Sequence, residues 1–198
     1  WFRGLRLEVG PGVFIPRLET ELVAEQAIQE ARRLVMSGAC PSVVDLCAGT
    51  GAIALAVASE VPGCRVSAVE LDDAAVVWTR RNVCGSGVEV LVGDALRVPD
   101  DGRRFDVVVT NPPYLRRIDA PSIPDDVTGH EPDFALFSGD DGLDLPLRLI
   151  ERAAELLVPG GLFIMEHDDT QREELMAALA TSYLWEPVSY THLRAHET

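Results

Sequence analysis

The stretch from Val43 to Gly51 constrains the fold more than any other part of the chain. It reads Val-Val-Asp-Leu-Cys-Ala-Gly-Thr-Gly and leads directly into an apolar run at 52–58. A buried strand, a tight glycine turn and a helix therefore follow one another. Such a unit is typical of open α/β sheets that hold a nucleotide-type cofactor, because glycines let a ligand approach the backbone closely. Glycine turns after strands also occur without any ligand, so further evidence is needed for a site.

Strand signals and helix signals alternate along the rest of the chain. This alternation predicts an α/β fold with a doubly wound, mostly parallel sheet. Residues 2–15 alternate loosely around the turn Gly10-Pro11-Gly12, which predicts an N-terminal β-hairpin. The expected strands are 42–46, 65–69, 89–92, 106–110 and 162–166, and the expected helices include 19–36, 52–58, 73–82 and 145–157.

Polar residues stand at the carboxyl ends of the predicted strands, where sheets of this kind bind ligands. Glu70 lies about 20 positions beyond the glycine turn, at the place where an acidic side chain accepts hydrogen bonds from ribose hydroxyls. The chain lacks the full G-x-G-x-x-G pattern and has no helix start clearly arranged for a pyrophosphate, which favours S-adenosyl-L-methionine, a cofactor without phosphates. Asp94 is equally explained as a helix N-cap. The residues expected to meet in this crevice are Asp45, Glu70, Asp94 and Asn111.

The motif Asn111-Pro112-Pro113-Tyr114 predicts the chemistry of the site. An amide or aromatic amino nitrogen attacks poorly while its lone pair is delocalised, and acceptors on its two N–H bonds localise that pair. The Asn111 side-chain oxygen supplies one acceptor, and the Pro112 carbonyl supplies the other because consecutive prolines fix the backbone. With Tyr114 flat against the target plane, the motif predicts methyl transfer onto nitrogen, with Asn111 and Pro112 catalytic and residues 111–114 binding substrate. The alternative is a strand-ending turn, which Asn and Pro also favour.

With these motifs the chain resembles the release factor glutamine methyltransferases, the protein-(glutamine-N5) methyltransferase family. The Asn-Pro-Pro-Tyr motif is shared with DNA adenine methyltransferases. The Ile-Pro-Arg-x-Glu-Thr-Glu stretch and the Glu-Pro…Ala-Leu…Gly-Leu-Asp stretch are more specific to the family. The segments that carry the resemblance are 12–21, 45–51, 111–114 and 130–144.

The resemblance implies a Rossmann-like class I S-adenosylmethionine-dependent methyltransferase fold, with S-adenosyl-L-homocysteine as the product of the cofactor. It implies N5-methylation of the glutamine in the Gly-Gly-Gln motif of class I peptide chain release factors, which would be the partners. In the family, the segment at 15–21 closes over the cofactor, although acids at a helix start also explain it. The cofactor-binding residues so expected are Pro16, Arg17, Asp45, Cys47, Ala48, Gly49, Thr50, Gly51, Glu70, Asp94, Ala95 and Asn111.

The resemblance also predicts how the chain is divided. Residues 1–18 are expected to form the β-hairpin or interdomain segment, residues 19–188 the catalytic domain, and residues 189–198 a tail of doubtful origin that matches nothing in the family. The family carries a separate N-terminal helical domain ahead of the hairpin, so the chain is expected to be a fragment. The closing strand of the family is not apparent near the tail, which would leave an exposed sheet edge. His130 is interpreted as structural.

Composition narrows the function classes. The net charge of −15 and the scattered arginines disfavour DNA or RNA as a substrate, since phosphate binding needs a basic face. No apolar run is long enough to span a membrane. The four cysteines show neither zinc spacing nor the density of a secreted scaffold, and no signal peptide precedes them, which indicates the cytoplasm. No metal is expected. Two alternatives stay open: an adenine-N6 or guanine-N2 nucleic-acid methyltransferase, and a catalytically silent cofactor-binding module.

Overall fold

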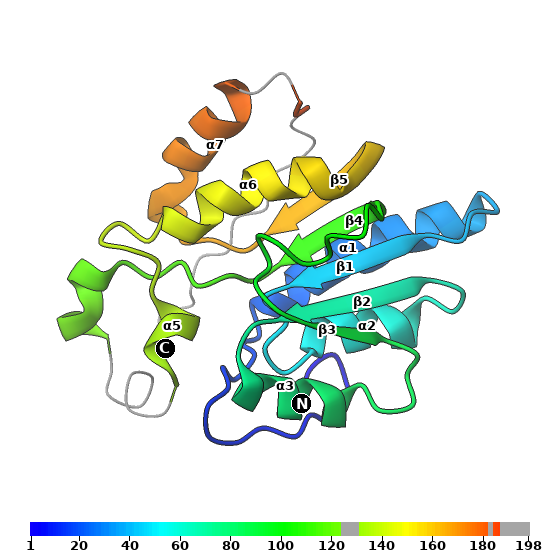
Figure 1. Cartoon of the computed structure of the whole chain (residues 1–198), viewed down its shortest axis with the longest axis horizontal. Coiled ribbons are helices and arrows are strands. Elements are labelled where there is room, and N and C mark those ends of the chain that lie inside the picture. The colour runs from blue at the N-terminus through cyan, green and yellow to red at the C-terminus, as the bar shows by residue number, and fades with distance from the viewer. Residues whose placement is uncertain (124–130, 182–183, 187–198) are drawn as a thin grey trace.

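The structure, a computed structural model, describes residues 1–123, 131–181 and 184–186 and is built around one parallel sheet. The strands are β1 Ser42–Leu46, β2 Arg65–Glu70, β3 Glu89–Val92, β4 Phe105–Thr110 and β5 Leu157–Met165. The five strands lie in the order β3-β2-β1-β4-β5 (Figure 1). Because β1 pairs with both β2 and β4, the direction of winding reverses at β1. Open α/β sheets bind their ligands beside such a reversal.

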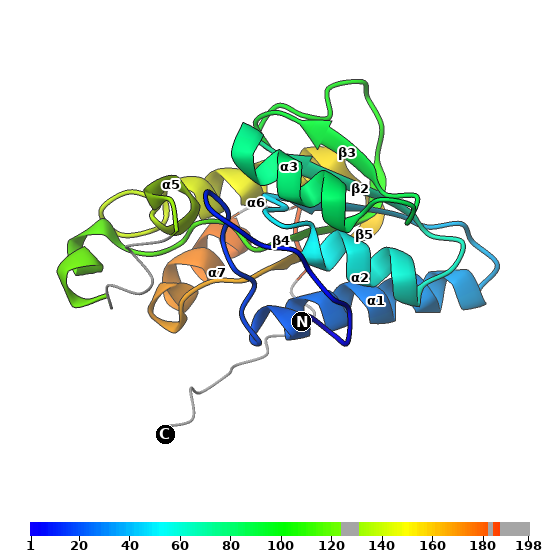
Figure 2. The ribbon, with the colours of Figure 1, turned by 90° about the horizontal axis from the view of Figure 1, so that it is seen from below.

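Helices cover both faces of the sheet (Figures 1 and 2). The helices are α1 Thr20–Met36, α2 Ala52–Glu60, α3 Asp73–Asn82, α5 Asp133–Leu136, α6 Asp144–Leu156 and α7 Arg172–Thr181, with 3-10 turns at η1 Arg117–Ser122 and η2 Asp169–Gln171. Successive residues of a strand point to opposite faces. Val43 and Val107 therefore pack against α1 and α2, whereas Val44 and Val108 pack against α6. This confirms the predicted doubly wound arrangement.

The strand β5 begins earlier than the sequence suggests. The run Pro159-Gly160-Gly161 reads as a break, so the strand was expected to begin at Leu162. In the structure the strand begins at Leu157, and the pairing of β4 with β5 shifts register between Phe105 and Val107. The proline and glycines thus lie in an irregular part of an outer strand, where such residues are tolerated.

The structure corrects the predicted N-terminal hairpin over residues 2–15. Only one isolated bridge, at the start of the segment, joins two of the described residues there. The backbone finds its partners on α3 instead. The Asn82 side chain accepts from the Glu8 N–H at 2.7 Å and donates to the Glu8 carbonyl at 2.9 Å, and the Trp78 indole donates to the Pro11 carbonyl at 3.3 Å. We call residues 2–18 the N-terminal strap; it contacts α3 around Glu8 and Pro11, and its start is bonded through Arg3 to α1 and α2.

Three segments, 124–130, 182–183 and 187–198, lie outside the described residues. The interpretation of His130 and the prediction about the tail at 189–198 fall on them and stay predictions. In the ranges that are described, β3 and β5 are the outer strands of the sheet. No helix in those ranges combines the length and the apolar character that a membrane span requires.

Candidate active site

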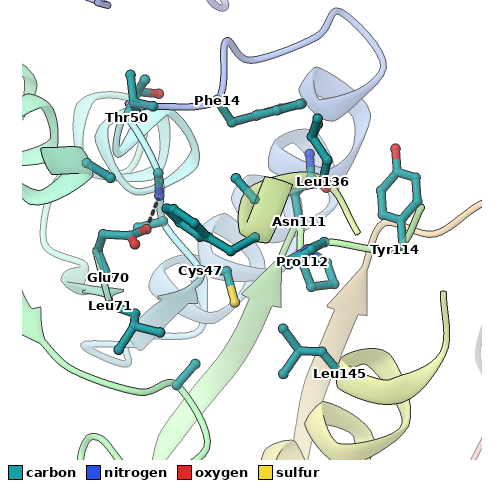
Figure 3. A pocket seen from close by; sticks show the side chains of 18 of the residues that line it. Phe14, Cys47, Thr50, Glu70, Leu71, Asn111, Pro112, Tyr114, Leu136 and Leu145 are labelled. Atoms are coloured by element: carbon teal, nitrogen blue, oxygen red, sulfur yellow. Dashed lines mark hydrogen bonds between the residues drawn. The ribbon is translucent and has the colours of Figure 1, made fainter. Parts of the chain in front are cut away.

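A cavity of about 500 Å³ opens beyond the carboxyl ends of the strands (Figure 3). Its walls are the loops that follow β1, β2, β3 and β4, the N-terminal strap, and α5. This volume is typical of small-molecule sites. The predicted site residues that line the cavity are Pro16, Arg17, Cys47, Ala48, Gly49, Thr50, Glu70, Asp94, Ala95, Asn111, Pro112, Pro113 and Tyr114.

Apolar side chains that the sequence reasoning missed complete the wall. Phe14, Leu71, Leu136 and Leu145 all face this space (Figure 3). Leu71 directly follows Glu70, so its position next to this predicted ribose-binding carboxylate could have been predicted from the sequence. Leu136 and Leu145 come from α5 and α6, and no local pattern connects them to the glycine turn.

Two predicted cofactor residues, Asp45 and Gly51, do not line the cavity, and their part in cofactor binding stays a prediction. Asp45 is fully buried, and its carboxylate accepts from the Ala54 N–H at 3.1 Å, which ties β1 to α2. Burial raises the pKa of Asp45 to about 8. Gly51 has a φ of 76°, and a Cβ there would lie 3.0 Å from Thr79 Cγ2, so the turn requires glycine. Both residues shape the loop from behind.

Glu70 holds the loop at one end of the cavity, which we call the cofactor end because cofactor binding is predicted there. Its Oε2 accepts from the Gly49 N–H at 2.7 Å (Figure 3). Its Oε1 accepts from the Asp72 N–H at 2.9 Å. The Thr79 hydroxyl donates to the Gly49 carbonyl at 2.6 Å and holds the loop from the other side. Carboxylate oxygens have lone pairs beyond those used here, so Glu70 can also accept from hydroxyl groups in the cavity. This geometry fits a ribose diol.

Cys47 and Asp94 line the cavity with side chains that have local roles. Burial raises the pKa of the Cys47 thiol to about 12, so the thiol stays protonated and fills space. Asp94 accepts from the Leu96 N–H at 2.9 Å within a turn over residues 95–97, and no helix begins there, so the structure corrects its interpretation as a helix N-cap. With Ala95 and Leu71 nearby in the lining, this end of the cavity offers apolar surface suited to a planar base. An acidic residue for hydroxyls and apolar walls for a base together fit S-adenosyl-L-methionine.

The Asn-Pro-Pro-Tyr motif forms the other end of the cavity, and side chains behind it fix its geometry. The Asn111 Nδ2 donates to the Thr20 Oγ1 at 2.9 Å, so Oδ1 is the end of the amide that can accept from a group in the cavity. The Tyr114 hydroxyl donates to the Glu166 Oε1 at 3.0 Å. The Tyr114 carbonyl accepts from the Gln171 Nε2 at 2.8 Å. Tyr114 is therefore held at both ends, and its predicted stacking on the target stays a prediction.

Glu166 is a carboxyl group that the sequence reasoning did not assign to the site. Burial raises its pKa, although Thr20, Tyr114 and Asn111 favour its charged form. Oε2 is inaccessible to solvent and makes no hydrogen bond to any residue that the structure describes. Burial, followed by the charge of Glu166, also raises the pKa of Tyr114, which keeps the phenol neutral.

Arg17 lines the cavity but is engaged by a residue far away in sequence. Its guanidinium lies 2.8 Å from the Glu131 Oε2 and 4.9 Å from the centre of the Phe14 ring. Glu131 is buried and also accepts from the Ile15 N–H at 3.0 Å. This contact, the Arg17–Glu131 clasp, joins the N-terminal strap to the segment before α5. The two segments most specific to the sequence resemblance thus meet at the cavity.

Comparison with known proteins gives one family model and several named relatives. The model described as methyltransferase small domain matches residues 22–123. A release factor glutamine methyltransferase of Streptomyces coelicolor is 52% identical over 173 residues, which are 86% of this chain and 60% of that protein. A 4-amino-L-phenylalanine/4-methylamino-L-phenylalanine methyltransferase of Streptomyces pristinaespiralis is 40% identical over 195 residues, which are 96% of this chain and 65% of that protein.

The structural comparison agrees with the predicted fold. The solved structure of a ribosomal protein L11 methylase from Lactobacillus delbrueckii subsp. bulgaricus has a TM-score of 0.60 at 20% identity, and the match covers 89% of this chain and 74% of that chain. This confirms the Rossmann-like class I fold. The sequence matches confirm the resemblance to release factor glutamine methyltransferases, and the chain spans less than two thirds of the length of the two curated relatives described above.

Proposed function

Because the chain belongs to the methyltransferase small domain family, we propose that it transfers a methyl group from S-adenosyl-L-methionine to the side-chain nitrogen of a glutamine. The substrate we propose is the glutamine of the Gly-Gly-Gln motif in class I peptide chain release factors, which places the reaction in the cytoplasm. The observation that carries the proposal is Asn111 at the end of β4, with its donor end bonded to Thr20 and its oxygen left for an NH2 group. The 52% identity to a protein named for this activity supports the choice of substrate.

The residues of the chain would divide the work between two ends of the cavity. S-adenosyl-L-methionine, when bound, supplies a methyl group on a positively charged sulfur. Glu70 would accept from the ribose hydroxyls, and Leu71 and Ala95 would contact the base. Asn111 Oδ1 and the Pro112 carbonyl would accept hydrogen bonds from the two N–H groups of the substrate, which localises the nitrogen lone pair and directs it along the line of transfer. Once it carries the methyl group, the nitrogen would release one proton to solvent. Rate acceleration would come from this alignment, with reacting atoms about 3–3.5 Å apart.

A second candidate substrate is the aromatic amino group of a free amino acid. The observation that favours it is the 40% identity, over 96% of this chain, to a methyltransferase named for 4-amino-L-phenylalanine. An aryl NH2 group and an amide NH2 group are both planar and both offer two N–H bonds. The Asn111 and Pro112 acceptors would therefore suit either, and the distinction must come from the rest of the substrate.

The test is methyl transfer from radiolabelled S-adenosyl-L-methionine to four acceptors in parallel. They are an unmodified release factor, the same factor with the glutamine of its Gly-Gly-Gln motif replaced by glutamate, 4-amino-L-phenylalanine, and a mixture of DNA and RNA. Label on the intact factor alone is the expected result. Label on the free amino acid would favour the second candidate, label on nucleic acid would overturn both, and cofactor binding without any label would indicate a catalytically silent module.

A further inference from the structure

Thr20 uses its hydroxyl in an unusual way for the first residue of a helix. Threonine near a helix start commonly bonds to the free backbone N–H groups of the first turn. Here the α1 cap residue, Glu19, makes no side-chain cap bond. Thr20 is only 3% exposed, and its Oγ1 accepts from the Asn111 Nδ2, 91 residues away in sequence. The hydroxyl is therefore bonded to the first residue of the Asn-Pro-Pro-Tyr motif and not to the start of its own helix.

Glu166, which follows Asn111 in the sequence as Thr20 precedes it, lies near the same amide. Its N–H donates to the Thr110 carbonyl at 3.0 Å, which extends the pairing of β5 with β4 up to the residue before Asn111. The Tyr114 hydroxyl holds one carboxylate oxygen, and both Thr20 and Asn111 stabilise the charge of the carboxylate. Of these contacts, the hydrogen bond from the Asn111 Nδ2 to Thr20 holds the donor end of the amide, and Glu166 adds a carboxyl group nearby.

An asparagine amide has ends of nearly equal size, so packing alone does not select its orientation. If the amide rotated by half a turn, its NH2 would face the NH2 of the substrate, and neither group could accept. We propose that Thr20 and Glu166 are positioning residues that hold the donor end of Asn111 away from the cavity, so that Oδ1 meets the substrate nitrogen. This inference rests on the proposed function, because orientation matters only for a substrate that donates to Asn111.

The matched variants Thr20→Val and Thr20→Ser test the inference. Valine keeps the shape of threonine without the hydroxyl, whereas serine keeps the hydroxyl without the methyl group. Thr20→Val should lower kcat by roughly 10- to 100-fold, the range expected when one buried hydrogen-bond partner is removed. Cofactor affinity should stay within about twofold, and Thr20→Ser should recover most of the lost turnover. Equal losses in the two variants, unchanged turnover in Thr20→Val, or a parallel loss of cofactor affinity would each overturn the inference.

A measurement that needs no turnover separates this inference from the proposed function. In the nuclear magnetic resonance spectrum, the side-chain amide protons of Asn111 should exchange slowly with water in the native chain and in Thr20→Ser, and quickly in Thr20→Val. Fast exchange in the native chain would overturn the positioning role even if methyl transfer were observed. Slow exchange in a chain that transfers no methyl group would support the positioning role while the proposed function failed.

Glu166→Gln extends the test to the second positioning residue, with Glu173→Gln on the exposed start of α7 as its control. The new amide in Glu166→Gln can turn an NH2 group toward Asn111 and weaken its orientation. We expect a lower kcat with the cofactor affinity retained, and no change for Glu173→Gln. Equal turnover in the two variants would remove Glu166 from the proposal.

Discussion

The two ends of the cavity differ in how far apart in sequence their contacting residues lie. At the cofactor end, Gly49 is bonded to Glu70 across 21 residues, within the unit formed by β1, α2 and β2. At the substrate end, Asn111 depends on Thr20, 91 residues earlier. The cofactor end is therefore the product of one local unit, whereas the substrate end requires the assembled sheet. A substitution at the cofactor end should then leave kcat nearly unchanged, and a substitution at the substrate end should leave cofactor affinity nearly unchanged.

The largest effect is expected for Asn111→Ala. Removing one preorganised hydrogen-bonding group at a reacting centre lowers kcat by roughly 10²- to 10³-fold, and this variant also abandons the bond to Thr20. We expect kcat to fall by at least that much while the dissociation constant for S-adenosyl-L-methionine, measured by calorimetry, stays within a few-fold. A large loss of cofactor affinity would show that the two ends of the cavity depend on each other and would contradict their independence.

Glu70→Ala should show the opposite behaviour. It removes the acceptor of the Gly49 and Asp72 N–H groups and of the proposed ribose contact, so the dissociation constant for the cofactor should rise by about 30- to 100-fold. At saturating cofactor, kcat should stay within a few-fold. Glu70→Gln retains one acceptor, so its dissociation constant for the cofactor should lie between those of the native chain and Glu70→Ala. A kcat loss as large as that of Asn111→Ala would show that Glu70 acts on the reacting atoms.

Glu131→Gln should have a smaller effect, because it weakens the Arg17–Glu131 clasp without removing either end of the cavity. Arg17 is 37% exposed, so solvent screens part of the attraction. We expect the cofactor to dissociate about tenfold faster in stopped-flow measurements. The control is Asp133→Asn, whose pair with Arg117 is exposed on both sides and should not alter the rate. Equal rates for the two variants would remove the clasp from the site.

Asp45→Asn should change catalysis least, and its effect should be visible in stability. Burial raises the pKa of Asp45 from 3.8 to about 8, so folding favours the neutral carboxyl. The contribution of Asp45 to stability is complete below about pH 4 and is lost as the pH rises toward 8. The free energy of unfolding of the native chain should therefore fall relative to Asp45→Asn over that window, by up to about 1.4 kcal/mol per pH unit. Parallel curves from denaturant titrations would contradict the buried carboxyl.

The contrast between the two ends also explains what the sequence could predict. Local structure fixes the spacing of the strand, the glycine turn and Glu70. The fold and the place of the cofactor end could therefore be predicted from the sequence. Thr20, Glu131 and Glu166 act through contacts that arise only when α1, the segment before α5 and β5 come together, and no local pattern marks those contacts. The hairpin prediction was wrong for the same reason, because the backbone partner of Glu8 is a side chain on α3.

The central claim is that Asn111 and Pro112 hold a planar NH2 group for methyl transfer. The most direct measurement is tandem mass spectrometry of a release factor after incubation with this chain and S-adenosyl-L-methionine. A single methyl group on the side-chain nitrogen of the Gly-Gly-Gln glutamine, absent when Asn111→Ala replaces the native chain, is the predicted result. A methyl group on a carboxylate or on a backbone atom, or one that persists with Asn111→Ala, would contradict the claim.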